Sequence, residues 1–224
     1  MASKLILVTG ANSGIGFQIV RALYDSKQAY NILVGGRSLE KAQVSSSIQI
    51  DIENDASIQS AFTEVQSKFG KLDALINNAG AQFDRSLAAG NLTVQEAWNQ
   101  SWNVNTVGTQ VLTSTFMPLL LQSPDPRLLF LTSGTSTLDN TALTANHNPP
   151  NGWPKSGISF AAYRSAKCGL NMLMREWYRM LREDGVKVWA ISPGLLGTGI
   201  SRDPEILEMG LVIRRLRVLL FEVC

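Results

Sequence analysis

A glycine-rich segment, Thr9–Gly16, constrains the fold of this chain more than any other stretch. It follows the apolar run Leu5–Val8 and precedes apolar residues at helical spacing, Ile19, Val20 and Leu23. This order predicts a strand, a glycine turn and a helix in immediate succession. Because a helix N-terminus carries free N–H groups and the positive end of the helix dipole, the segment predicts a phosphate-binding site.

Each glycine of this turn has its own predicted task. Gly10 permits the tight turn, Gly14 leaves room for a pyrophosphate, and Gly16 lets the helix pack closely on the strand. The spacing is G-x-x-x-G-x-G and not the G-x-G-x-x-G of the dinucleotide fingerprint. A glycine-rich connection in some other α/β protein is the alternative interpretation.

Apolar runs alternate with helical patterns along most of the 224 residues. This alternation predicts an α/β fold, a doubly wound parallel sheet with helices on both faces, in a single domain over residues 1–224. Turn formers in residues 146–154 predict a surface loop inside an insertion at 134–162. The expected strands are Leu5–Val8, Asn31–Gly35, Ile48–Ile52, Ala74–Asn77, Arg127–Thr132 and Val186–Ile191, and the expected helices cover residues 15–27, 38–45, 55–69, 93–121 and 160–184.

The composition narrows the compartment and the partners. With 45% hydrophobic and 17% charged residues the chain is globular, and a net charge of +2 gives no reason to expect a nucleic acid. No apolar run is long enough to cross a bilayer, and the immediate first strand predicts no signal peptide. Cys168 and Cys224 make neither a disulfide framework nor a metal cluster, and the single histidine, His147, has no second ligand nearby in sequence. We therefore expect a cytoplasmic protein without a metal site.

The ends of three expected strands predict cofactor contacts. Strand two ends in Arg37 and Ser38, where a carboxylate would bind a free ribose 2′-hydroxyl but an arginine accommodates a 2′-phosphate. A solvated loop residue is the alternative for Arg37. Asp51, after strand three, either accepts from the adenine amine or serves as a helix cap or turn residue. Strand four ends in Asn77–Gly80, whose small residues leave room for a flat ligand.

Tyr163 and Lys167 lie four residues apart on an expected helix and so share one face. A nearby ammonium favours the phenolate, so we expect Lys167 to lower the pKa of Tyr163 and make it a usable general acid or base. Ser133, after strand five, is placed to hold a carbonyl oxygen. An ordinary surface contact is the alternative for the Tyr163–Lys167 pair.

In their order along the chain these motifs resemble the short-chain dehydrogenase/reductase family. The resemblance rests on Thr9–Gly16, Asn77–Gly80, Asn105, Ser133, Tyr163-x-x-x-Lys167 and Pro193-Gly194, and it extends to about Thr198. It implies a Rossmann fold, a catalytic tetrad and a nicotinamide cofactor, with NADPH or NADP preferred because strand two ends in Gly-Arg-Ser. The tetrad is Asn105, Ser133, Tyr163 and Lys167; the implied cofactor contacts are Gly10, Asn12, Ser13, Gly14, Ile15, Gly16, Arg37, Ser38, Asp51, Ile52, Asn78, Ala79, Gly80, Tyr163, Lys167, Pro193, Gly194 and Thr198.

In this family the tyrosine donates the proton, the serine orients the substrate, the lysine holds the ribose and the asparagine anchors a water. The resemblance therefore implies hydride transfer between nicotinamide and a small carbonyl or alcohol substrate, in a homodimer or homotetramer formed by the long helices. The alternatives are a non-redox isomerisation, dehydration or cyclisation with bound cofactor, or a degenerate member without enzymatic activity.

Three regions depart from the family pattern, and the first is the segment between Arg37 and Asp51, where only 13 residues leave room for a helix of about two turns. The insertion at 134–162 is longer than family members show, and residues 199–224 do not look like the usual closing strand. Val212, Leu216, Leu219, Leu220 and Val223 recur at helical spacing while the arginines lie off that stripe, which predicts an amphipathic helix over 211–224. We expect it to cover an apolar or strand-edge surface, with a membrane-surface helix as the alternative.

Overall fold

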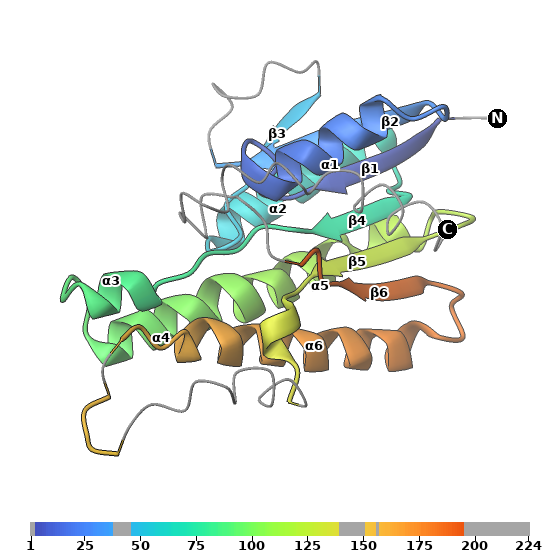
Figure 1. Cartoon of the computed structure of the whole chain (residues 1–224). Helices are drawn as coiled ribbons and strands as arrows, with labels where there is room; N and C mark the ends of the chain where they lie inside the picture. Colours follow the sequence, from blue (N-terminus) through green and yellow to red (C-terminus); the bar gives the residue numbers. More distant parts are fainter. Residues whose placement is uncertain (1–2, 38–45, 139–150, 156, 195–224) are drawn as a thin grey trace.

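The computed structural model describes residues 3–37, 46–138, 151–155 and 157–194. Six parallel strands form one sheet in the order β3-β2-β1-β4-β5-β6 (Figure 1). They are β1 (Lys4–Val8), β2 (Tyr30–Gly36), β3 (Ser47–Gln49), β4 (Ala74–Asn77), β5 (Arg127–Leu131) and β6 (Lys187–Ile191). The strand order reverses between β1 and β4, and ligands of open α/β sheets bind outside the strand ends at such a reversal.

Alternating side chains of β1, β2, β4, β5 and β6 supply two hydrophobic cores, one on each face of the sheet. Leu5 and Leu7 of β1 belong to the core that contains α2, α5 and α6, whereas Ile6 and Val8 belong to the core beneath α1. Every strand except the edge strand β3 therefore buries side chains on both faces, as expected for a parallel sheet. The predicted doubly wound fold with helices on both faces is confirmed.

The helices begin and end near the predicted residues, with local differences. They are α1 (Gly14–Tyr24), α2 (Asp55–Phe69), α3 (Asp84–Ala88), α4 (Val94–Trp102), α5 (Gly108–Leu120) and α6 (Ala161–Leu181). A capping box between Thr93 and Glu96 starts α4, and the Asn54 side chain caps α2. The helix predicted over 93–121 is α4 and α5 joined by a π-helical segment, η1 (Asn103–Val107).

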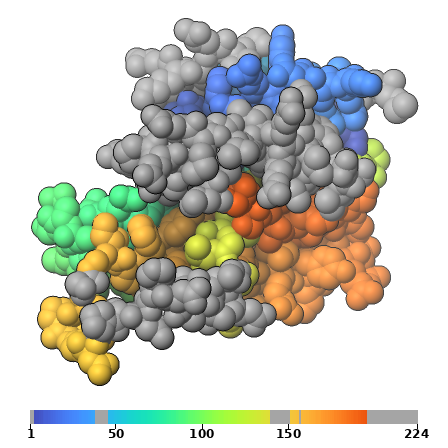
Figure 2. All heavy atoms as spheres, viewed as in Figure 1, coloured from blue at the N-terminus to red at the C-terminus, as the bar shows by residue number. Residues whose placement is uncertain are grey.

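Two short elements were not predicted from the sequence. They are α3 and a 3-10 turn, η2 (Gly134–Ser136), which lies at the start of the region predicted as an inserted loop. Helix α3 and the beginning of α6 lie at the same end of the molecule (Figures 1 and 2). Three predictions concern residues outside the described ranges. They are the helix at 38–45, the departure from the usual closing strand in 199–224, and the amphipathic helix at 211–224.

Candidate active site

The glycine turn follows β1 and is fastened to the end of β4. The Thr9 hydroxyl accepts hydrogen bonds from the backbone N–H groups of Asn78 and Ala79, each at 3.1 Å. In return the Asn78 side-chain amide donates to the Thr9 carbonyl at 2.8 Å and to the Gly10 carbonyl at 3.2 Å. The two strand ends on either side of the sheet reversal are thus held as one unit.

The three glycines occupy the conformations predicted for them. Gly10 and Gly14 have φ values of +61° and +55°, in the left-handed region that favours glycine. A Cβ atom on Gly16 would lie 2.5 Å from both the Asn78 Nδ2 and the Gly10 carbonyl oxygen, so close packing requires glycine there. A Cβ on Gly14 would meet nothing within 4 Å, which leaves its backbone open to a ligand.

A cavity of about 790 Å³ lies at the carboxyl ends of the strands. It brings together most of the predicted site residues, from the glycine turn to the helix that carries Tyr163 and Lys167. Gly16, Ser133 and Gly194 are described but do not line it, and Ser38 and Thr198 lie outside the described residues. The predicted residues that line it are Gly10, Asn12, Ser13, Gly14, Ile15, Arg37, Asp51, Ile52, Asn78, Ala79, Gly80, Asn105, Tyr163, Lys167 and Pro193.

Arg37 and Asp51 lie at the β2–β3 side of this cavity. Arg37 is exposed, and within the described residues no carboxylate forms an ion pair with its guanidinium. It is therefore available to an anionic ligand. Asp51 accepts a hydrogen bond from the Glu53 N–H at 3.1 Å, which confirms the turn role considered for it. Asp51 also lines the cavity.

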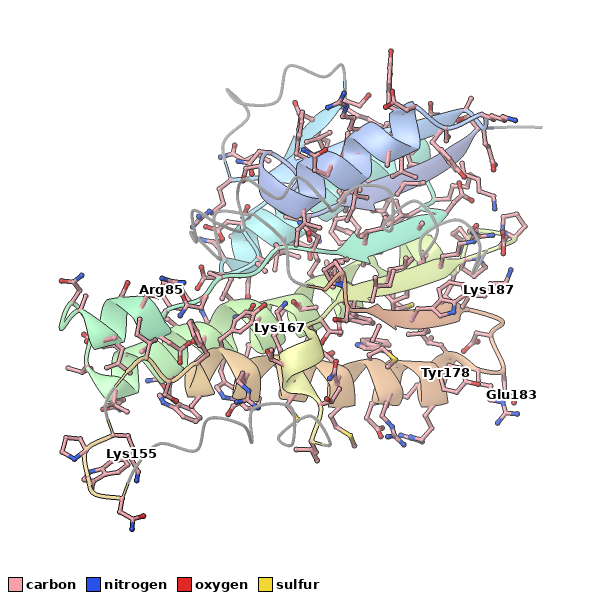
Figure 3. The ribbon with its side chains drawn as sticks, viewed as in Figure 1. Arg85, Lys155, Lys167, Tyr178, Glu183 and Lys187 are labelled. Atoms are coloured by element: carbon pink, nitrogen blue, oxygen red, sulfur yellow. The ribbon has the colours of Figure 1, made fainter. Side chains whose placement is uncertain are left out.

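Lys167 of α6 lines the cavity and is buried, with a relative exposure of 4%; Figure 3 labels its side chain. Its ammonium donates to the Leu131 carbonyl at 2.9 Å and lies 6.0 Å from the centre of the Tyr163 ring. Burial lowers the pKa of Lys167 from 10.5 to about 8. The predicted shared face of Tyr163 and Lys167 is confirmed.

The predicted direction of the Tyr163 pKa shift is wrong. Burial raises the pKa of Tyr163 above its usual value near 10, and a hydrogen bond with the Ser133 side chain opposes this rise only in part. Desolvation of the phenolate outweighs any help from Lys167, whose own charged form is destabilised by burial. The phenol is therefore protonated at neutral pH, the form that donates a proton.

Asn105 is fully buried in η1 and fixes the floor of the cavity. Its side-chain amide donates to the carbonyls of Ala81 and Ser101, at 2.8 and 2.9 Å, and accepts from the Ala81 N–H at 3.3 Å. A Cβ on Gly80 would lie 2.7 Å from the Asn105 Oδ1 and 3.3 Å from the Lys167 Nζ. Only glycine at this position leaves both side chains where they are.

Sequence reasoning missed several residues around the site. Phe83, Gln100, Val104, Leu131 and Thr132 also line the cavity, and Asp84 contacts the helix that carries Tyr163. None of these belongs to a short motif, because their positions depend on how distant elements pack. For Asp84 the sequence offered one signal, which is that it is an acidic residue soon after the Asn77–Gly80 turn.

Within the described residues, no group of three or more histidine, cysteine or acidic side chains could hold a metal ion. No helix of the described part of the chain is long and apolar enough to cross a membrane. His147 lies outside the described residues.

Comparisons with known proteins agree with this architecture. The short chain dehydrogenase family model matches residues 4–145 and 152–205. The short-chain dehydrogenase/reductase eupG of a Phoma species is 47% identical over 218 residues, covering 88% of this chain and 78% of that protein. The short-chain dehydrogenase/reductase tropE of Talaromyces stipitatus is 44% identical over 217 residues, covering 88% and 80%.

Solved structures share the fold. An NADPH-bound carbonyl reductase from chicken fatty liver superposes with a TM-score of 0.76 at 23% identity, covering 91% of this chain and 84% of that one. A Rossmann-type sheet, a glycine turn joined to β4 and a Tyr-x-x-x-Lys helix at one cavity accompany the family match over most of the chain. The chain therefore belongs to the short-chain dehydrogenase/reductase family of oxidoreductases.

Proposed function

We propose that this protein is an NADP(H)-dependent oxidoreductase that transfers hydride between nicotinamide and a small carbonyl or alcohol substrate. The observation that carries the proposal is that the glycine turn, Arg37, Tyr163 and Lys167 all line one cavity of about 790 Å³. Its volume falls in the range of small-molecule and cofactor sites. The cavity joins a phosphate-binding helix end to a proton donor.

The residues present fit a nicotinamide dinucleotide phosphate. Ser13, Gly14 and Ile15 line the cavity at the N-terminus of α1, where backbone N–H groups and the helix dipole would hold the pyrophosphate. The exposed guanidinium of Arg37 would bind the ribose 2′-phosphate. Lys167 and the backbone around Asn78–Gly80 would hold the nicotinamide riboside half. The cofactor would supply or accept the hydride.

The chain itself would supply the proton and the orientation. Tyr163 is held protonated by burial and would donate its phenolic proton to the carbonyl oxygen as that oxygen gains negative charge. Ser133, whose side chain lies near the Tyr163 phenol, would hold the same oxygen. Lys167 would replace the proton lost from Tyr163 through the cavity, and Asn105 would keep the floor beside Lys167 in place.

The exposed apolar side chains of the long helices support a homodimer or homotetramer. Val94, Trp98 and Trp102 of α4 are 63%, 36% and 38% exposed, and Met172 and Tyr178 of α6 are 58% and 50% exposed. Helix α4 packs on α6, so these side chains belong to one layer of helices. Static light scattering of the purified protein measures the assembly directly.

A cytoplasmic location is proposed from the cysteine usage.

The test is turnover of NADPH and NADH with a panel of ketones and aldehydes, using wild type, Tyr163→Phe and Arg37→Ala. Wild type should prefer NADPH. Arg37→Ala should weaken NADPH binding by about one to two decades and leave NADH binding nearly unchanged, because one charge-assisted contact is lost. Tyr163→Phe should abolish reduction and keep cofactor binding, because only the proton donor is removed.

Three results would contradict the proposal. Equal binding of NADPH and NADH by wild type would remove the role of Arg37. Near-normal carbonyl reduction by Tyr163→Phe would remove the role of the phenol. Conversion of substrate without net NADPH consumption, seen by product analysis, would replace hydride transfer with an isomerisation, dehydration or cyclisation.

A further inference from the structure

Helix α6 carries Tyr163 and Lys167 but begins without a cap of its own. The first N–H groups of any helix lack partners within the helix, and the residue before it ordinarily caps those of the second and third helical positions. In α6 that residue is Phe160, whose side chain makes no capping hydrogen bond. The two N–H groups in question belong to Ala162 and to Tyr163 itself.

Asp84 of α3 supplies the missing cap from a distant part of the chain. Its Oδ1 accepts from the Ala162 N–H at 2.9 Å, and its Oδ2 accepts from the Tyr163 N–H at 3.1 Å. The carboxylate is only 2% exposed. A buried negative charge at a helix N-terminus also interacts favourably with the helix dipole. One oxygen thus holds the backbone of the proposed proton donor, and the other holds that of the residue before it.

The same stretch of chain forms the floor of the cavity. From the end of β4 to α3, residues 78–81 and Phe83 line the cavity, and Asn105 holds Ala81 through both its N–H and its carbonyl. Asp84 follows directly. The floor and the catalytic helix are therefore connected through one carboxylate, at the end of the molecule where α3 and the start of α6 meet (Figure 2).

We propose that Asp84 is a positioning residue for the reaction: it fixes the height of Tyr163 above the cavity floor by capping α6 from α3. The proposal rests on the proposed function for its kinetic part. Misplacement of a reacting group by about 1 Å lowers rates by about 100-fold. Loss of the two acceptors should therefore act on the proton-transfer step far more than on cofactor binding.

The central variant is Asp84→Asn, whose amide keeps one acceptor and turns an NH₂ group toward the other N–H. Its kcat should fall by about 10- to 100-fold, while KM and the NADPH dissociation constant change by less than about threefold. Hydrogen exchange of the Ala162 and Tyr163 amides, followed by NMR on the full chain, should accelerate at whichever of the two faces the new NH₂ group, because that amide loses its acceptor.

The matched control is Asp73→Asn, the same substitution at another buried carboxylate. Asp73 is 3% exposed and holds the Leu5 N–H and the Ser123 hydroxyl near the start of β1, away from the cavity. This variant should lower the melting temperature but keep kcat within about twofold and leave exchange at Ala162 and Tyr163 unchanged. A general loss of stability is thereby separated from misplacement of Tyr163.

If Asp84→Asn does not fold, Asp84→Glu is measured instead. The glutamate keeps both acceptor oxygens but displaces them. It should protect the two amides and still lower kcat by at least about fivefold. A wild-type kcat in either Asp84 variant, or unchanged amide exchange in Asp84→Asn, would overturn the proposal. A wild-type protein that reduces no carbonyl with NADPH would instead overturn the proposed function, and the exchange data would still show whether Asp84 holds the helix.

Discussion

Replacing Lys167 by methionine should make the folded protein more stable and inactive. Lys167 is 4% exposed, and its pKa in the fold is about 8 against an ordinary 10.5. From that difference, the charged ammonium lowers the free energy of unfolding at pH 7 by about 3 kcal/mol. Methionine is of similar length and carries no charge, so this penalty disappears in the variant.

The stabilisation is reduced because the backbone carbonyl that accepts from Lys167 loses its donor in the variant. Its ammonium donates to the Leu131 carbonyl at 2.9 Å, and an unpartnered buried carbonyl costs about 1–2 kcal/mol. The net stabilisation of Lys167→Met at pH 7 should therefore be about 1–2 kcal/mol. For a domain of this size that is an increase of roughly 3–7 °C in melting temperature.

The pH dependence provides the sharper test. Because the pKa of Lys167 is lower in the folded than in the unfolded state, the unfolded chain binds more protons between about pH 8 and 10.5. Wild-type stability should therefore rise with pH in this window, and the variant lacks that rise. The advantage of Lys167→Met should be full below pH 8 and lost or slightly reversed at pH 10, because wild type regains about 1.4 kcal/mol per pH unit between the two pKa values.

Urea unfolding of wild type and Lys167→Met at pH 7 and pH 10 measures this difference. Lys68→Met is the control, because Lys68 has a side chain 60% exposed in an i,i+4 pair with Glu64 and its loss should change stability by less than about 0.5 kcal/mol at either pH. A Lys167→Met protein no more stable than wild type at pH 7, or a difference independent of pH, would refute the reasoning.

Two further predictions concern stability. Gly16→Ala should destabilise the fold by about 1–3 kcal/mol in urea titrations and weaken NADPH binding, because its Cβ would overlap the Asn78 side chain and the Gly10 carbonyl; an unaltered unfolding midpoint would contradict this. Asp125 bonds Lys4, Arg127 and Lys187, which together hold its pKa well below the usual range. Asp125→Asn should therefore lower stability by about 1 kcal/mol at pH 7, and the difference should shrink steadily as the pH falls below about 4 toward the lowered pKa; a difference that does not shrink below pH 4 would show that charge is not its cause.

The parts of the fold that follow local rules were predictable from the sequence. The strand positions depend on apolar runs between turn formers, and the glycines of the first turn are required by positive φ values at Gly10 and Gly14 and by the contact of Gly16 with the Gly10 carbonyl. Both kinds of requirement are written in neighbouring residues. The same holds for the Tyr163–Lys167 pair, because helical spacing alone places them on one face.

Features that depend on distant packing were not predictable in this way. The cap that Asp84 gives to α6 joins residues 78 positions apart. The sign of the Tyr163 pKa shift depends on how deeply the phenol is buried, which spacing along a helix does not reveal. The π-helical segment within the predicted helix 93–121 changes only the local hydrogen-bond register, so the apolar pattern around it still reads as one helix.

The central place of β1 in the sheet also bears on the synthesis of the chain. β1 pairs with β2 on one side and with β4 on the other. The β4 side of β1 therefore has no partner until β4, a later segment of the chain, has been synthesised. At about 5–20 residues per second on the ribosome, β4 emerges a few seconds after β2. During that interval the nascent chain presents an apolar strand with open backbone groups, a template for pairing with other chains. Aggregation during production of this protein should therefore depend on translation speed and chaperone supply more than on the stability of the finished fold.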